Sequence, residues 1–405
     1  MKKVFFTVLA AAALSSALFA ADKKKQIEFS NELSSDLIHH IAPKNSNRDS
    51  HTSFAGLTEN VKADYNGDIV KVGADANLYM KDPNGTWNDD DGQPFYITEW
   101  DADWYVEFNP FKVVGFGFSD ELYTEGSLLP VWDSNVNAGN YSTNGFAGLI
   151  RPIKELSFGA GFDVPAAWFG DDGNAYELAL GVDYNSDPFS IGGSLRHIGT
   201  DDHFQLGVYA SIKAIDKLKI NVGFTHSEDG DAGLGNVTFV SPYNYWDGTS
   251  SSWVSFLNAE GIYGENILTG GVVFDAGNFQ ILGDLAFSFD TDYSYKGYWW
   301  TINGTSVQIG KGGYDFYTAV EFKMELTKVI GLDIKGLALF DFGDETVLGT
   351  NGWRDLDPTF GVYPKVVFTL NDHHTLYAGI IVQSCTDSDY GYTEFALPVG
   401  WKYTY

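Results

Sequence analysis

The chain has 405 residues, a formal net charge of −29 and a single cysteine, Cys385. The acidic balance argues against nucleic acid as a partner, because a phosphate backbone repels a surface of its own sign. The lone cysteine excludes an intramolecular disulfide framework, so stability must come from backbone pairing and packing. Glycine is abundant, with 45 residues, and 16% of the chain is aromatic, a composition that suits many short strands and turns.

Residues 1–21 have the pattern of a cleaved secretory signal peptide. Lys2 and Lys3 form a positive start, residues 4–14 form an apolar stretch, and small residues around Ala20 provide a cleavage site. That stretch is too short to cross the roughly 30 Å of hydrocarbon in a bilayer. No later segment stays apolar for about 18 residues, so residues 22–405 are predicted to form one exported domain without a transmembrane helix.

From Gln26 onward, segments of about ten residues alternate between apolar and polar side chains. The clearest is 69–80, whose even positions are all apolar and whose odd positions are mostly polar. The pattern recurs at 176–184, 204–212, 218–224, 279–289, 314–326, 330–342 and 360–370. A tilted strand needs about 9–11 residues to cross a bilayer, so these segments have the length of membrane-crossing strands.

The connections between these segments are alternately short and long. This alternation predicts an all-β fold. The specific prediction is a transmembrane antiparallel up-and-down β-barrel of about 18 strands, with short periplasmic turns and long extracellular loops. The first hairpin is the weakest part, because Asn31 and Glu59 would lie on its apolar face. Without that hairpin the count would be about 16 strands.

The last stretch, 395–405, alternates large apolar or aromatic residues with small or polar ones. The large positions include Phe395, Trp401, Tyr403 and Tyr405. This ending resembles the C-terminal strand by which bacterial outer-membrane β-barrels are recognised for assembly. The resemblance implies an outer-membrane location in a diderm bacterium, with membrane lipid and the barrel assembly machinery as partners. The whole chain resembles porins in its architecture, which implies a possible homotrimer.

The polar face of the strands is predicted to line a water-filled channel. A barrel of about 16–18 strands encloses more space than its side chains can fill. The predicted pore-lining residues are Glu99, Asp101, Asp103, Glu107, Asp75, Asp315, Glu321, Asp333, Lys71 and Lys335. Acids outnumber bases about two to one on this face, which predicts a preference for cations or neutral solutes. The competing interpretation of the same pattern is the solvated outer face of a soluble sheet.

The long loops contain further candidate sites. Trp246, Trp299 and Trp300 are predicted either to stack on sugar rings at the channel mouth or only to pack the loops together. The acidic runs 88–92, 171–174 and 228–231 offer oxygen ligands for Ca²⁺ or Mg²⁺, although none has the complete spacing of an EF-hand loop. By resemblance to general porins, the longest loop, 227–264, is the best candidate to fold inward.

Catalytic motifs are missing from the sequence, so no enzyme activity and no cofactor is predicted. The function that fits best is a porin-like channel for passive diffusion of small hydrophilic solutes such as sugars. One alternative is a surface-exposed adhesin or structural barrel with a blocked lumen. Another is a secreted soluble β-protein.

Overall fold

The computed structural model describes most of the chain outside its long connections. The described residues are 27–41, 50–67, 70–81, 96–108, 110–115, 127–133, 146–162, 178–198, 204–227, 239, 244–247, 252–255, 265–289, 299–302, 305–309, 315–341, 347–349, 352–354, 358–386 and 392–404. The predicted signal peptide, 1–21, and Tyr405 lie outside these ranges. Among the described residues, no helix is long and apolar enough to span a bilayer.

The strands of the described residues form two sheets: the large one is antiparallel, and the small one is antiparallel except where β13 pairs with β16 in parallel. The large sheet contains β1 (Ile27–Ile41), β2 (His51–Asn66), β3 (Lys71–Lys81), β4 (Tyr96–Phe108), β5 (Phe111–Gly115), β6 (Phe146–Ile153), β7 (Leu156–Phe162), β8 (Leu178–Ser186), β9 (Phe189–Ile198), β10 (Gln205–Ile215), β11 (Leu218–Ser227), β14 (Asn266–Asp275), β15 (Phe279–Ser288), β18 (Asp315–Glu325), β19 (Ile330–Asp341), β22 (Thr359–Thr369), β23 (His374–Gly379), β24 (Ile381–Cys385) and β25 (Tyr392–Thr404). The small sheet contains β12 (Asn244–Asp247), β13 (Ser252–Ser255), β16 (Trp299–Ile302), β17 (Thr305–Ile309), β20 (Val347–Gly349) and β21 (Gly352–Arg354).

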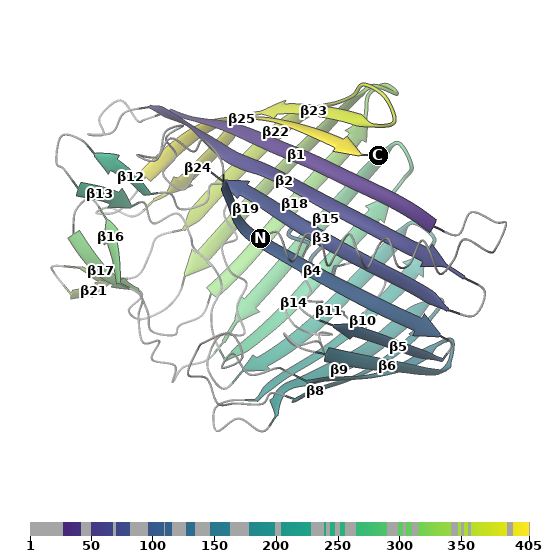
Figure 1. The fold of residues 1–405 in the computed structure, drawn as a ribbon. Helices are drawn as coiled ribbons and strands as arrows, with labels where there is room; N and C mark the ends of the chain where they lie inside the picture. The colour runs from purple at the N-terminus through teal and green to yellow at the C-terminus, as the bar shows by residue number, and fades with distance from the viewer. Residues whose placement is uncertain are drawn as a thin grey trace.

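The large sheet closes into a barrel of 18 strands (Figure 1). β23 and β24 count as one strand, because both pair with β22 on one side and with β25 on the other. Closure is made by β1 and β25, whose register runs from Glu32 opposite Thr404 to Ile41 opposite Phe395. Every other pair of neighbours in the barrel consists of barrel strands that follow each other along the chain, because the strands numbered between them belong to the small sheet. The predicted fold class is confirmed.

The first hairpin belongs to the barrel, which settles the strand count at 18 rather than 16. The two polar residues on its apolar face, Asn31 and Glu59, lie on adjacent strands and are hydrogen-bonded to each other. The Asn31 side-chain amide donates to the Glu59 carboxylate at 3.0 Å. A polar pair that is hydrogen-bonded costs far less on an apolar face than either group alone. The broken hydrophobic pattern is therefore compensated locally.

A proline explains why one barrel strand is interrupted. Pro364 lies inside β22, opposite Ile334 of β19, and has no N–H to donate to a neighbouring strand. On its other side the ladder breaks at Ile380, which separates β23 from β24. The Ile380 N–H still donates to the Pro364 carbonyl at 3.0 Å, so the interruption is a local irregularity in a continuous strand.

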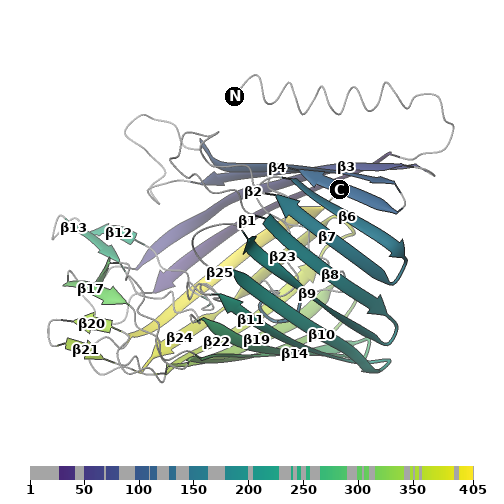
Figure 2. The same cartoon turned by 90° about the horizontal axis from the view of Figure 1, so that it is seen from below.

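The small sheet is built from three of the predicted external loops. β12 and β13 lie in the predicted loop 227–264, β16 and β17 in the connection between β15 and β18, and β20 and β21 in the connection between β19 and β22. In Figures 1 and 2 these strands lie beyond one end of the barrel, at the left. The two visible links between hairpins are short, Ser255 with Ile302 and residues 308–309 with 347–348. The stretch from Trp253 therefore adds a strand to a loop sheet and not to the barrel.

Candidate pore constriction

Alternation along the barrel strands creates one apolar face and one mixed face. On β8, Leu180 and Val182 are each 42% exposed, whereas Ala179 and Asp183 on either side of them are buried. The same pattern holds on β10, where Val208 and Ile212 are exposed and Tyr209 and Ser211 are buried. An exposed face made of large apolar side chains suits hydrocarbon, so the opposite face lines the interior of the barrel.

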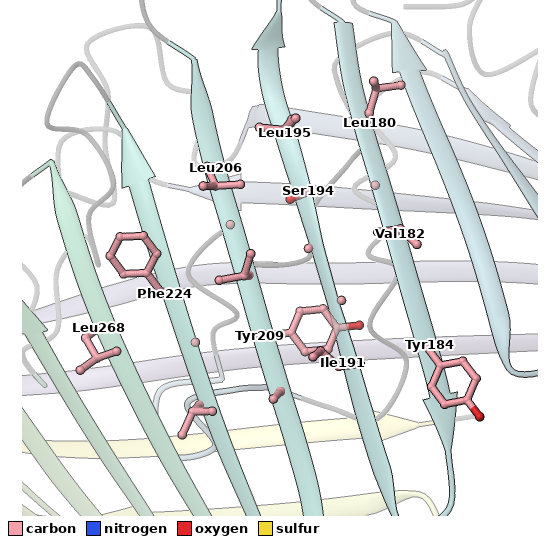
Figure 3. A pocket seen from close by; sticks show the side chains of 18 residues that line it. Leu180, Val182, Tyr184, Ile191, Ser194, Leu195, Leu206, Tyr209, Phe224 and Leu268 are labelled. Carbon is pink, nitrogen blue, oxygen red and sulfur yellow. The ribbon is translucent and has the colours of Figure 1, made fainter.

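The outer face carries an apolar hollow of about 850 Å³ over β8 to β11 and β14 (Figure 3). Its lining includes Leu180, Val182, Ile191 and Leu195, and contains no charged side chain. A charged or strongly polar solute gains nothing from such a surface. A candidate site with polar and charged groups must therefore be sought on the inner face.

A short segment from the connection between β5 and β6 lies against the inner wall. The described part of this connection is 127–133, and its Leu128 and Leu129 are almost completely buried. The backbone N–H groups of Val131 and Trp132 donate to the Asp284 carboxylate at 3.0 and 2.8 Å. Asp284 is itself only 2% exposed. Because a buried carboxylate needs donors, this contact fixes the segment to β15 strongly.

Further contacts hold the same segment from both sides. The Asn221 amide donates to the carbonyl of Ser127 at 3.0 Å, and the Lys335 ammonium donates to the carbonyl of Val131 at 3.3 Å. At Gly271 on β14, a side chain would overlap the carbonyl of Leu128, so only glycine permits this approach. We call residues 127–133 the inserted segment.

Beneath the inserted segment, the interior is apolar rather than wet. Leu129 and Val131 pack into a cluster formed by β14, β15, β18 and β19, whose other members are Ile267, Leu282, Ala286, Tyr317, Ala319, Leu337 and Leu339. On this side of the barrel a loop segment covers the apolar cluster, so these inward side chains contact protein and not the lumen. Removing these side chains from water stabilises the docked position of the segment.

The loop 227–264, predicted to fold inward, also contributes one described contact to the interior. The Phe239 N–H donates to the side-chain oxygen of Gln383 at 3.0 Å, and its ring lies 5.9 Å from that of Tyr363. Gln383 is fully buried. The inward contact made by this loop agrees with the prediction, but the prediction missed the inserted segment. A signal was available, since Leu128, Leu129 and Val131 are unusually apolar for an external loop.

Charged residues form a ladder on the inner wall beside the inserted segment. Glu321 on β18 is 1% exposed and lies 3.1 Å from the Lys323 ammonium and 3.4 Å from that of Lys335. Asp333 lies 2.8 Å from Lys365 on β22. In each pair the lysine is more exposed than the acid. The acids are thus set into the wall, and the lysines shield them from the lumen.

Replacing Glu321 with alanine should destabilise the barrel, because Lys323 and Lys335 would lose their common partner. Both lysines are partly exposed, so solvent screening limits the expected loss of stability to about 1–2 kcal/mol. The midpoint of the heat-dependent shift in gel mobility measures this loss. Glu325→Ala, an exposed position on the same strand, is the matched control and should leave the midpoint unchanged. Equal midpoints for both variants would contradict the assigned role.

The structure describes the side chains of some predicted pore-lining residues and only the backbone pairing of others. Glu107 lies 3.9 Å from Lys71 and 3.7 Å from Arg151, and Tyr105 donates to Asp64 at 2.9 Å, which places these side chains on the inner face. For Asp75, Glu99, Asp101 and Asp103, the structure describes only the strand register. It sets Asp75 opposite Asp103, and Asn77 opposite Asp101. Asp315 begins β18 and is half-buried, and its N–H donates to the Ser288 hydroxyl at 3.0 Å.

The predicted loop tryptophans lie in the small sheet and not in the barrel wall. Trp246 pairs with Trp253 in the small sheet, while Trp299 and Trp300 begin β16; their side chains fall outside the described parts. The acidic runs 88–92, 171–174 and 228–231 also lie outside the described residues. Within the described residues, no group of three or more metal-ligating side chains is arranged to hold an ion.

The terminal strand has the predicted alternation. Phe395 is 40% exposed on the outer face, and Trp401 and Tyr403 are partly exposed on that face. The indole N–H of Trp401 donates to a ring nitrogen of His374 at 3.2 Å, which fixes the aromatic end of β25 to β23. On the inner face, Lys402 lies 2.7 Å from Glu32 of β1.

No known protein family model matches the chain, and no characterised protein matches it in sequence. Solved structures match the fold. OpdL from Pseudomonas aeruginosa has a TM-score of 0.54 at 9% identity, over 94% of this chain and 99% of that one. OccAB4 from Acinetobacter baumannii has a TM-score of 0.54 at 9% identity, over 95% and 99%. The outer membrane protein opdK from Pseudomonas aeruginosa has a TM-score of 0.51 at 11% identity, over 93% and 99%.

This chain has the fold of an outer-membrane β-barrel. The match covers nearly the full length of both chains, so it includes the whole closed sheet and not a local hairpin. At such low identity the likeness concerns the fold alone. The function therefore has to be argued from the inner wall of this barrel.

Proposed function

We propose that this protein is a porin-like outer-membrane channel for passive diffusion of small hydrophilic solutes. The observation that carries the proposal is the inserted segment, which is fixed to one side of the inner wall by Asp284. An 18-stranded barrel is wide enough to hold an aqueous channel. A segment fixed to one wall narrows such a channel without filling it.

The preferred solutes are cations or neutral molecules such as sugars. On the side of β18, β19 and β22, the acids are neutralised by lysines, so that wall contributes little net charge. We attribute the acidic excess to β3 and β4, where the register sets Asp75 opposite Asp103 and Asn77 opposite Asp101, with Lys62 of β2 on the other side of Asp75. Acidic groups along a pore raise the local concentration of cations.

Reversal potentials across a planar bilayer with a salt gradient test this preference. The wild-type channel should favour cations, and Asp101→Asn should lower the cation-to-anion permeability ratio. One carboxylate contributes about 1 kcal/mol at 4 Å in water, so the ratio should fall by up to about fivefold. Glu325→Gln, which removes the same charge at the short-turn end of β18, is the control. An anion-selective wild-type channel would overturn the preference.

The outer-membrane setting of the proposal has further parts. Residues 1–21 act as the export signal, the short turns face the periplasm, and the loop sheet faces outward. The partners are membrane lipid and the barrel assembly machinery, which recognises Phe395, Trp401, Tyr403 and Tyr405. Assembly into a homotrimer belongs to the same proposal and is testable by crosslinking in native membranes. Catalysis and a resident cofactor have no part in it.

The alternative is a surface-exposed adhesin or structural barrel with a blocked lumen. Two observations favour it: the apolar cluster under the inserted segment, and the loop sheet that gathers Trp246, Trp253 and Trp299 outside the barrel. Its loop aromatics would then bind sugars on a surface and not at a channel mouth. Conductance separates the two functions, because a blocked barrel passes no ionic current.

A further inference from the structure

The same arrangement of three residues occurs at three places on the inner wall, each time across three adjacent strands. An aspartate, a glycine and a tyrosine lie side by side in register: Asp64, Gly73 and Tyr105 on β2, β3 and β4; Asp183, Gly192 and Tyr209 on β8, β9 and β10; and Asp36, Gly400 and Tyr377 on β1, β25 and β23. In each case the tyrosine hydroxyl donates to the aspartate two strands away.

The glycine in the middle is what permits this hydrogen bond. A side chain at Gly400 would overlap both the Tyr377 ring and the Asp36 carboxylate. At Gly192, a Cβ would lie 2.8 Å from the Tyr209 hydroxyl, closer than side chains tolerate. Each tyrosine ring therefore lies flat across a glycine, and its hydroxyl reaches a partner that an ordinary residue would hide.

Only one of these three arrangements crosses the closure of the barrel. β1 and β25 are the two strands of the closed sheet that no connection joins, whereas β2 to β4 and β8 to β10 are consecutive along the chain. Tyr377 belongs to β23, so its bond to Asp36 spans β25 completely. The contact can form only when the last strand has already paired with the first.

We propose that Tyr377, Gly400 and Asp36 form a clasp that locks the barrel shut after closure. The pair of strands without a covalent connection is the one that separates first when a barrel opens, because no turn holds its ends together. The clasp ties β1 to β23 across the terminal strand, so β25 cannot leave without breaking a hydrogen bond to a charged acceptor. The salt bridge between Lys402 and Glu32 adds to the same closure.

Unfolding rates of two matched variants test the clasp. Tyr377→Phe and Tyr105→Phe each remove one hydroxyl that bonds a carboxylate and keep the ring over the glycine. The rate is followed in detergent at high temperature by the heat-dependent change in gel mobility. A hydrogen bond to a charged group is lost in opening the closure, so Tyr377→Phe should unfold about tenfold faster than wild type. Tyr105→Phe should unfold no more than about twofold faster, because its strands are not the first to separate. Equal acceleration in both variants would overturn the proposal.

An engineered disulfide between β1 and β25 tests whether Tyr377 stabilises the closure or only the packing around its own ring. Ser34 and Lys402 face each other in the register of β1 and β25, at a separation that a disulfide can span. In a Cys385→Ser background, Ser34→Cys and Lys402→Cys should crosslink the closure on oxidation. In this background, the difference in unfolding rate between the protein with Tyr377 and the Tyr377→Phe variant should disappear when the disulfide is oxidised. It should return when the disulfide is reduced. A difference that persists in the oxidised protein would show that Tyr377 stabilises its own wall and not the closure.

Discussion

Replacing Asp284 with alanine should raise the single-channel conductance, because the inserted segment would lose its main attachment to the wall. Asp284 accepts the N–H groups of Val131 and Trp132 in a buried position. Two hydrogen bonds to a carboxylate contribute about 3 kcal/mol together, which shifts the balance between docked and released segment roughly 100-fold. Conductance of the purified variant in a planar bilayer, compared with wild type in the same salt, measures the effect.

A neighbouring pair of glycines supplies the control for this experiment. Gly271→Ala should also raise the conductance, because its new methyl group would overlap the Leu128 carbonyl. Gly270→Ala should leave it unchanged, since a Cβ there meets only ordinary contacts at 3.9 Å. Unchanged conductance in both Asp284→Ala and Gly271→Ala would mean that the inserted segment does not set the width of the pore.

Deleting residues 401–405 should abolish assembly into the membrane almost completely. The deletion removes the closure pairs that join Trp401, Lys402, Tyr403 and Thr404 to β1, and the contact of Trp401 with His374. It also removes most of the predicted assembly signal. The amount of heat-modifiable protein in the outer-membrane fraction, relative to total protein, measures the loss.

Two further variants distinguish the effect of losing the terminal aromatic side chains from the effect of shortening the strand. The double substitution Trp401→Ala and Tyr403→Ala keeps the strand but removes outer-face aromatics, and should reduce assembly strongly. Thr404→Ala alters the inner face next to the same residues and should assemble normally. Normal membrane levels of the deletion variant would refute the assigned role of the terminal strand.

The barrel could be predicted from sequence because its signals are local. Period-two alternation over about ten residues, together with turns at regular intervals, defines each strand from its own residues. The alternation predicts strands at 330–342 and 279–289, and the structure has them at Ile330–Asp341 and Phe279–Ser288. Errors at these boundaries are small, because the alternation of apolar and polar residues stops where each of these strands ends.

The constriction was not predictable in the same way, because its contacts join distant parts of the chain. Asp284 and Val131 are separated by 153 residues, and neither sequence neighbourhood indicates the other. The loop sheet has the same origin, since β13 and β16 meet only after folding brings two loops together. The pairing of the charged residues was not predictable for a related reason. Glu321 and Asp333 count as lumen acids in the sequence, but the fold buries them against lysines.

The central claim, an open channel narrowed by the inserted segment, is tested most directly by single-channel recording of the purified protein in a planar bilayer. An open channel predicts discrete, stepwise increases in ionic current on insertion, with larger steps for Asp284→Ala. Insertion of folded, heat-modifiable protein without any current in either form would contradict the claim and favour a barrel with a blocked lumen.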